Sequence, residues 1–248
     1  MAEAASARPQ KVLLDVRGLR VAYGKAEVVR DVSLDVRAGE FVVILGRNGA
    51  GKSTILHAIS GLIPKRAGTV TFEGRDLSAA TPRETVRAGI VQVLEGHRVF
   101  QTLSVEDNLL IGTYAKAPRG DRTKLERIYA LFPEMAERRT QMASRLSGGQ
   151  QQILAVAQGV IGDPRLLVLD EPSGGLAPIV VDRILDVAAK LCAEGLAILL
   201  VEQLVDKALR HAHWGYLVET GRVAASAASA DLRDGELVRK VYLGGHAA

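Results

Sequence analysis

Cysteine, aromatic residues and long hydrophobic runs are all scarce in this sequence, and each shortage excludes a class of protein. A single cysteine in 248 residues excludes an internal disulfide and fits a reducing compartment. Aromatic residues make up 4%, which disfavours stacking surfaces for single-stranded nucleic acid. No apolar run approaches the roughly 18 residues that a transmembrane helix needs, and the opening residues, MAEAASARPQ, lack the apolar segment of a signal peptide. We therefore expect a cytoplasmic protein that reaches a membrane only through a partner.

Charge of one sign is not concentrated either. The formal net charge is +4, and the lysines and arginines are scattered rather than clustered. This distribution is typical of an ordinary solvated surface, so we expect no nucleic-acid partner. A weak attraction to an anionic membrane face stays open.

The sequence does contain a large apolar fraction, arranged in short and long segments that alternate. Hydrophobic residues make up 48%, which is enough for a sizeable core. Short apolar runs predict strands at 12–14, 32–34, 41–45, 70–72, 89–94, 166–169 and 196–201, and a β ribbon at 215–223. Helical spacing predicts helices at 52–60, 105–114, 123–138, 150–160, 179–193 and 203–211. We therefore expect a flexible tail at 1–11 and one α/β domain at 12–245, whose mainly parallel core (12–94 and 161–245) is interrupted by a helical subdomain at 95–160.

A glycine-rich loop follows the buried strand expected at 41–45. Its glycines permit positive φ angles and a close backbone approach, so successive N–H groups can point at one anion. The start of the next helix adds positive charge at the same place. Lys52 is expected to reach the β- and γ-phosphates of a nucleoside triphosphate, and Ser53 to offer its hydroxyl to Mg²⁺. The predicted phosphate-binding residues are Gly46, Arg47, Asn48, Gly49, Ala50, Gly51, Lys52, Ser53 and Thr54.

Two carboxylates end the apolar run that begins at Leu166. Asp170 can hold Mg²⁺ through water, and Glu171 is placed to polarise the water that attacks the γ-phosphate. An acidic pair at a strand end is often only a helix cap, but the phosphate loop upstream favours a catalytic interpretation. We therefore predict Glu171 and Lys52 as catalytic residues, and Ser53 and Asp170 as metal ligands.

A second glycine-rich helix start lies between these two motifs. It reads Leu146-Ser147-Gly148-Gly149-Gln150, and 150–160 has helical spacing. With the phosphate loop and the Asp170-Glu171 pair in this order, the chain resembles the nucleotide-binding subunits of ABC transporters over roughly 12–245. The resemblance implies a P-loop NTPase fold with a mainly parallel core sheet, an antiparallel β subdomain and an inserted α-helical subdomain. It also implies that ATP is the nucleotide and that two such subunits work as a pair.

The resemblance assigns further residues. Tyr23 matches an aromatic residue that stacks on adenine, and a buried strand tyrosine is the alternative interpretation. The family pattern also implies that one helix start grips the γ-phosphate bound to the opposite subunit; its residues are Ser147, Gly148, Gly149 and Gln150.

Three positions depart from the pattern of the superfamily. Glu95 aligns with a glutamine near Mg²⁺, whereas Gln92 falls inside the preceding strand. Gln203 stands where a switch histidine is usual, and the loop at 171–178 has Ala177 without the usual aspartate. By the resemblance, Glu95 belongs to the metal site and Gln203 to the catalytic residues. Whether this chain's own site hydrolyses ATP at the usual rate stays open.

At these same positions the sequence resembles one branch of the family, the LivF-type ATPases of branched-chain amino-acid importers. The segments that carry this likeness are 94–100, 105–108, 175–178, 201–203 and 242–245. The branch implies a place on the inner face of a bacterial membrane with two integral-membrane permeases, a second ATPase subunit (a different chain or another copy) and, indirectly, a periplasmic solute-binding protein. The implied solute is a branched-chain amino acid, with urea, short amides and aromatic acids as alternatives.

Two rival functions stay possible. One is an ATPase subunit of an exporter or lipid-transport complex, which the importer-like motifs disfavour. The other is a non-transport ABC ATPase acting on DNA or the ribosome. A single cassette with a short insert disfavours that second rival.

The remaining histidines and the cysteine favour structural roles. His211 and His213 lack a third ligand at useful spacing, so metal binding is disfavoured. His57 is expected to pack or face solvent, and His97 to contact a permease, the partner or solvent. Cys192 lies on the apolar stripe of a predicted helix, so we expect it to be buried.

Overall fold

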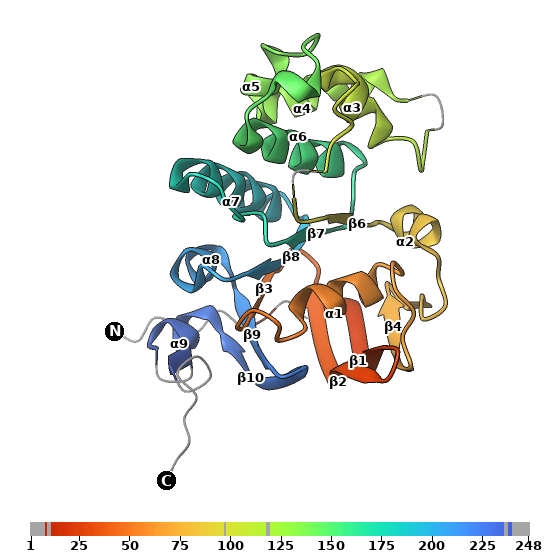
Figure 1. The fold of residues 1–248 in the computed structure, drawn as a ribbon, viewed down its shortest axis with the longest axis vertical. Coiled ribbons are helices and arrows are strands. Elements are labelled where there is room, and N and C mark those ends of the chain that lie inside the picture. Colours follow the sequence, from red (N-terminus) through yellow and green to blue (C-terminus); the bar gives the residue numbers. More distant parts are fainter. Residues whose placement is uncertain (1–7, 9–10, 97, 118–119, 236–237, 240–248) are drawn as a thin grey trace.

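The computed structural model describes residues 8, 11–96, 98–117, 120–235 and 238–239, which form two sheets and the helices around them (Figure 1). The strands are β1 Val12–Tyr23, β2 Ala26–Arg37, β3 Phe41–Leu45, β4 Ala67–Phe72, β5 Arg75–Asp76, β6 Ile90–Val93, β7 Leu166–Asp170, β8 Ala197–Glu202, β9 Trp214–Glu219 and β10 Arg222–Ala228. The helices are α1 Lys52–Ile59, α2 Pro82–Ala88, α3 Val105–Ile111, α4 Leu125–Leu131, α5 Pro133–Ala136, α6 Gly148–Ile161, α7 Pro178–Ala193, α8 Val205–His211 and α9 Ser229–Arg233. Short 3₁₀ turns cover Arg122–Lys124 and Ala143–Arg145.

The larger sheet has the strand order β10-β9-β3-β8-β7-β6 and is parallel except for β10. Strands β3, β7 and β8 are buried along their whole length, because both faces of the sheet are covered. One face packs against a core that includes α3, α4, α6, α7 and α8. The other face packs against α1 and the second sheet. The predicted mainly parallel α/β core is confirmed, and α1 and α6 lie on opposite faces of it.

The smaller sheet is antiparallel in the order β2-β1-β4-β5. Its long hairpin, β1 with β2, extends well beyond the short runs predicted at 12–14 and 32–34. Polar residues occupy alternate positions in these strands and face outward, so the apolar positions do not form a continuous run. The antiparallel β subdomain is confirmed.

Helices α3 to α6 lie between β6 and β7 in the chain and gather at one end of the molecule, beyond α7 (Figure 1). The single helix predicted at 123–138 is wrong. Phe132 leaves helical geometry with φ −129° and ψ 72°, because Pro133 follows it and disfavours a helical residue before it. The exact boundaries at 95 and 160 stay a prediction.

Helix α2 was not among the predicted elements, although its start carries a clear signal. Thr81 accepts a hydrogen bond from the amide of Glu84, whose carboxylate accepts one from the amide of Thr81, and Pro82 opens the helix. The helix connects β5 to β6 and so leads into the core sheet.

Near the start of the chain, Arg8 is anchored against the larger sheet. The rest of the predicted tail before Lys11 lies outside the described residues. The Arg8 guanidinium lies over the ring of Trp214 at 4.3 Å, and its Nε donates to the buried carboxylate of Glu40 at 2.7 Å. Cys192 is buried as predicted. Among the described residues, no helix is long and apolar enough to cross a membrane.

Candidate active site

The phosphate loop connects the end of β3 to the start of α1, and its glycines are required by close packing and backbone geometry. A Cβ on Gly46 would lie 2.3 Å from the carbonyl oxygen of Val218, so only glycine fits there. Gly49 and Gly51 have φ angles of 78° and 98°, in the left-handed region that favours glycine. The amide of Gly221 donates to the carbonyl of Ala50 at 2.9 Å and holds the loop against the β9–β10 turn.

Lys52 joins this loop to the end of β7. Its side chain is 3% exposed, and Nζ donates to the carbonyl oxygens of Gly46 at 3.0 Å and Arg47 at 3.2 Å. The same Nζ lies 3.1 Å from Oε1 of Glu171. The Lys52 ammonium is therefore held inside the phosphate loop, next to the start of α1, where a phosphate group would meet positive charge. The cleft over it is lined by Val28, Gly49, Gly51, Lys52, Ser53, Thr54 and Glu171.

Ser53 and Asp170 also come together, as predicted for a metal site. The Ser53 hydroxyl donates to Oδ1 of Asp170 at 2.8 Å, and Asp170 is 1% exposed. Burial raises the pKa of Asp170, while the Ser53 hydrogen bond and nearby His57 lower it. Hydroxyl and carboxylate oxygens are the donors that Mg²⁺ prefers, with phosphate and water completing the shell. The residues present therefore fit the ion.

His57 lies closer to this site than the sequence indicates. Its Nε2 is 3.3 Å from Oδ2 of Asp170, and the side-chain Nε2 of Gln92 donates to the same oxygen at 3.4 Å. The sequence signal was the helical spacing, because His57 follows Ser53 by four residues on α1 and so shares its face.

Glu95 is exposed and lies at the edge of the same region. It lines one cleft together with Ser53, His57 and Asp170, and its charge contributes to the raised pKa of Asp170. Its role as a metal ligand stays a prediction.

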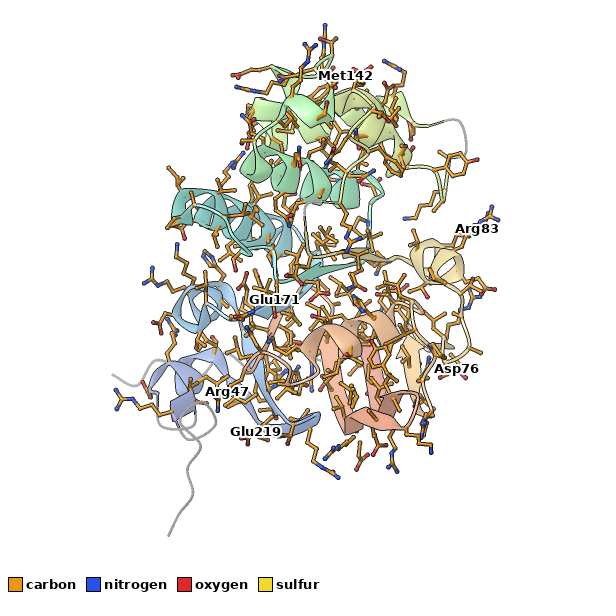
Figure 2. The ribbon with its side chains drawn as sticks, viewed as in Figure 1. Arg47, Asp76, Arg83, Met142, Glu171 and Glu219 are labelled. Carbon is orange, nitrogen blue, oxygen red and sulfur yellow. The ribbon has the colours of Figure 1, made fainter. Side chains whose placement is uncertain are left out.

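Glu171 and Gln203 meet over Lys52. Glu171 follows β7 with φ 43°, and its amide donates to the carbonyl of Val201 at 3.0 Å. Its carboxylate accepts a hydrogen bond from Nε2 of Gln203 through Oε2, while Oε1 faces Lys52. The three predicted catalytic residues therefore form one contact group, and Figure 2 shows Glu171 near the centre of the molecule.

Residues 147–150 begin α6 but do not line the cleft over Lys52. The Ser147 hydroxyl accepts from the amide of Gln150 at 3.3 Å, and Oε1 of Gln150 accepts from the amide of Ser147 at 3.0 Å. A Cβ on Gly149 would lie 2.9 Å from Cγ2 of Val180, so this glycine permits the close packing of α6 on α7. Ser147 and Gly148 are exposed, which leaves the helix start free to meet a ligand from outside this chain.

Tyr23 ends β1 and is 51% exposed, so the alternative of a buried strand tyrosine is wrong. Its stacking on adenine stays a prediction. Arg47 and Asn48 are exposed on the phosphate loop, and Arg47 shares a cleft with Glu219 at the β9–β10 end of the molecule (Figure 2).

The paired histidines are engaged in structural contacts. Nδ1 of His213 accepts from the amide of Phe41 at 2.9 Å, and the ring of His211 stacks on the Phe41 ring at 6.5 Å. His97 and the predicted segment at 242–245 lie outside the described residues.

Comparison with known proteins identifies the family of this chain. The ABC transporter family model matches residues 29–174. BraG of Pseudomonas aeruginosa, a high-affinity branched-chain amino acid transport ATP-binding protein, is 40% identical over 90% of this chain and 96% of its own length. LivF of Archaeoglobus fulgidus, a probable branched-chain amino acid transport ATP-binding protein, is 33% identical over 91% of this chain and 96% of its own. LptB of Escherichia coli, a lipopolysaccharide export system ATP-binding protein, is 32% identical over 93% and 97%.

A solved structure supports the fold. The ADP conformation of MJ1267, an ATP-binding cassette of an ABC transporter, matches with a TM-score of 0.82 and 25% identity over 94% of this chain and 99% of that chain. The predicted fold class and family are confirmed. The chain belongs to the ABC transporter family and is one of its nucleotide-binding ATPase subunits.

Proposed function

We propose that this chain hydrolyses ATP to drive an importer of branched-chain amino acids, bound to permease partners on the inner face of a bacterial membrane. The observation that carries the hydrolytic part is the contact group of Lys52, Glu171 and Gln203 beside the Ser53–Asp170 pair. The amino-acid part is supported by the likeness to BraG, which exceeds the likeness to LptB over a similar share of the chain.

In this proposal the loop amides and Lys52 bind the β- and γ-phosphates, and Tyr23 stacks on adenine. Ser53 and Asp170 would hold Mg²⁺, with Glu95 beside them; the ion supplies positive charge that stabilises the phosphate oxygens. Glu171 accepts a proton from the attacking water, and Gln203 fixes the orientation of its carboxylate. Since phosphoryl transfer depends mainly on positioning and electrostatics, these residues account for the main requirements of hydrolysis.

In this proposal a second subunit completes the site. The packing of α6 and α1 on opposite faces of the core sheet supports this, since it separates the start of α6 from the phosphate loop of the same chain. In the proposal, Ser147, Gly148, Gly149 and Gln150 contact the γ-phosphate held by a second ATPase subunit, either a different chain or another copy. ATP then favours the closed pair through contacts that the open pair lacks. Closure and reopening move the two permeases, and a periplasmic binding protein delivers the solute.

The test is transport by the assembled complex. The chain is purified with the proteins encoded beside its gene and reconstituted in liposomes that contain ATP. Uptake of leucine into the liposomes together with ATP turnover supports the proposal. Uptake of urea, short amides or aromatic acids instead would overturn the solute assignment. ATP-driven extraction of lipopolysaccharide would overturn import and favour the exporter function, which the likeness to LptB makes the second candidate.

A further inference from the structure

A second buried glutamate, Glu202, lies directly behind the proposed catalytic group. It is the last residue of β8 and 1% exposed, and no role was predicted for it from the sequence. A carboxylate in such a place needs donors that replace water, because an unpaired buried charge is strongly destabilising. Burial accordingly raises the pKa of Glu202, and the hydrogen bonds it accepts oppose that rise.

These donors come from two different loops. Ser173, in the loop after β7, donates its amide to Oε1 at 3.1 Å and its hydroxyl to Oε2 at 2.8 Å. The amides of Gln203 at 3.0 Å and Leu204 at 3.4 Å, in the loop after β8, both donate to Oε2. One carboxylate therefore joins the loop that carries Glu171 to the loop that carries Gln203.

The consequence for Glu171 follows from chain geometry. Ser173 is two residues beyond Glu171, whose φ of 43° turns the chain sharply out of β7. Gln203 is the next residue after Glu202, and its side chain donates to Glu171. Holding Ser173 and the Gln203 backbone on the same carboxylate thus sets the distance between the Glu171 carboxylate and its donor. If Glu202 served only to hold the backbone at the start of α8, it would need the amides of the loop after β8 but no hydrogen bond from Ser173, which belongs to the loop after β7.

We propose that Glu202 is a positioning residue for ATP hydrolysis, which holds Gln203 and the loop at 172–176 so that Glu171 faces the attacking water. This inference rests on the proposed hydrolytic role of Glu171. Glu202 contacts neither nucleotide-binding loop residues nor Lys52 among the hydrogen bonds of the described residues, so its effect falls on turnover and not on ATP binding.

The test is Glu202→Gln in the assembled, ATP-hydrolysing complex. The variant keeps the side-chain volume, but its NH₂ group cannot accept, so at least one of the charge-assisted hydrogen bonds is lost. Since Ser173 or the Gln203 backbone is then no longer held on this side chain, Glu171 is less well oriented, and kcat should fall by about tenfold or more. The KM for ATP should stay within about twofold, because the lost interaction is not one that binds substrate.

A double-variant measurement separates positioning from a structural role. In a Gln203→Ala background, Glu202→Gln should lower kcat much less than it does alone, because both changes remove the same orientation of Glu171. If the fold-loss in kcat of the double variant equals the product of the two single-variant losses, the proposal is overturned. Glu40→Gln is the matched control: Glu40 is equally buried and accepts charged hydrogen bonds away from the site, so that variant should lower the melting temperature and keep wild-type kcat.

The outcomes also separate this inference from the proposed function. If the wild-type complex hydrolyses ATP and Glu202→Gln leaves that rate unchanged, only the positioning role is overturned. If the wild-type complex itself does not hydrolyse ATP, the proposed function is overturned. If Glu202→Gln does not fold, Ser173→Ala removes the hydroxyl bond and retains the charge. It should lower kcat several-fold at unchanged KM, and wild-type kcat in that variant would overturn the proposal.

Discussion

Replacing Glu171 by glutamine tests the proposed hydrolytic site most directly. The carboxylate is held from two sides, by Lys52 with Nζ 3.1 Å from Oε1 and by Gln203, which donates to Oε2. Glutamine has nearly the same shape, and its oxygen can keep the contact with Lys52. Its amide cannot take a proton from water. The variant therefore removes the base and leaves the phosphate-binding residues in place.

The expected loss is large and falls on one kinetic constant. A positioned general base contributes about 10²–10⁴-fold, or roughly 3–5 kcal/mol of activation barrier, so kcat of the complex should fall by that factor. ATP affinity should stay the same or rise, because Lys52 no longer faces a competing full negative charge. Phosphate release by the complex measures the first quantity, and titration of the chain with a fluorescent ATP analogue measures the second.

A matched control excludes a general effect of lost charge. Glu219 is another carboxylate beside the phosphate loop, on the cleft that it shares with Arg47. Glu219→Gln removes the same charge without contact to Lys52 or Gln203 and should keep wild-type kcat. Hydrolysis by Glu171→Gln at the wild-type rate would refute the assignment of the base, and an equal loss in both variants would refute its specificity.

The remaining predictions concern binding, packing and burial. Tyr23→Ala should weaken ATP binding to the chain and Tyr23→Trp should retain it; equal binding by Tyr23→Ala and wild type, measured by calorimetry, would exclude stacking. Gly149→Ala places a Cβ 2.9 Å from Cγ2 of Val180 and should cost about 1–3 kcal/mol of unfolding free energy. Adding Val180→Ala should recover part of that loss in urea titrations, and no recovery would contradict a clash with Val180. Burial raises the pKa of the Cys192 thiol to about 11, so iodoacetamide at pH 8 should label it only as denaturant unfolds the chain; fast labelling of the native chain would contradict this burial. Ser147→Ala should impair hydrolysis at the partner's site while the isolated chain binds ATP normally, and an equal loss of both would contradict action across the pair.

The nucleotide-binding elements could be predicted because their chemistry is local in the sequence. The phosphate loop is one continuous segment that follows β3, and the Asp170-Glu171 pair lies at the end of β7. Both strands are buried on both faces, which produces unbroken apolar runs. Glu171 and Lys52 are 119 residues apart, yet their meeting was predictable from the motif order, since parallel strands bring their carboxyl ends to one edge.

Contacts made by single side chains across the fold could not be predicted in the same way. Glu202 looks like the polar end of an apolar strand, and nothing near it in the sequence indicates that Ser173 donates to it. For His57, the four-residue spacing from Ser53 indicated a shared face of α1, but the contact with Asp170 depends on the packing of β7 beside α1. The break at Phe132 was visible as a following proline, but helical spacing on both sides obscured it.

The contacts of Gln203 show which property of the usual histidine this chain keeps. Gln203 stands where a histidine is usual, yet it still donates a hydrogen bond to Glu171, and Lys52 supplies the positive charge on the other oxygen of that carboxylate. The substitution therefore removes a titratable group without removing the donor. Because Glu202 fixes the Gln203 backbone, the orientation of that donor depends on the loop at Ser173. The Ser173 loop and Gln203 share one carboxylate, so a change at Ser173 should be felt at Gln203 and at the Glu171 carboxylate that it contacts.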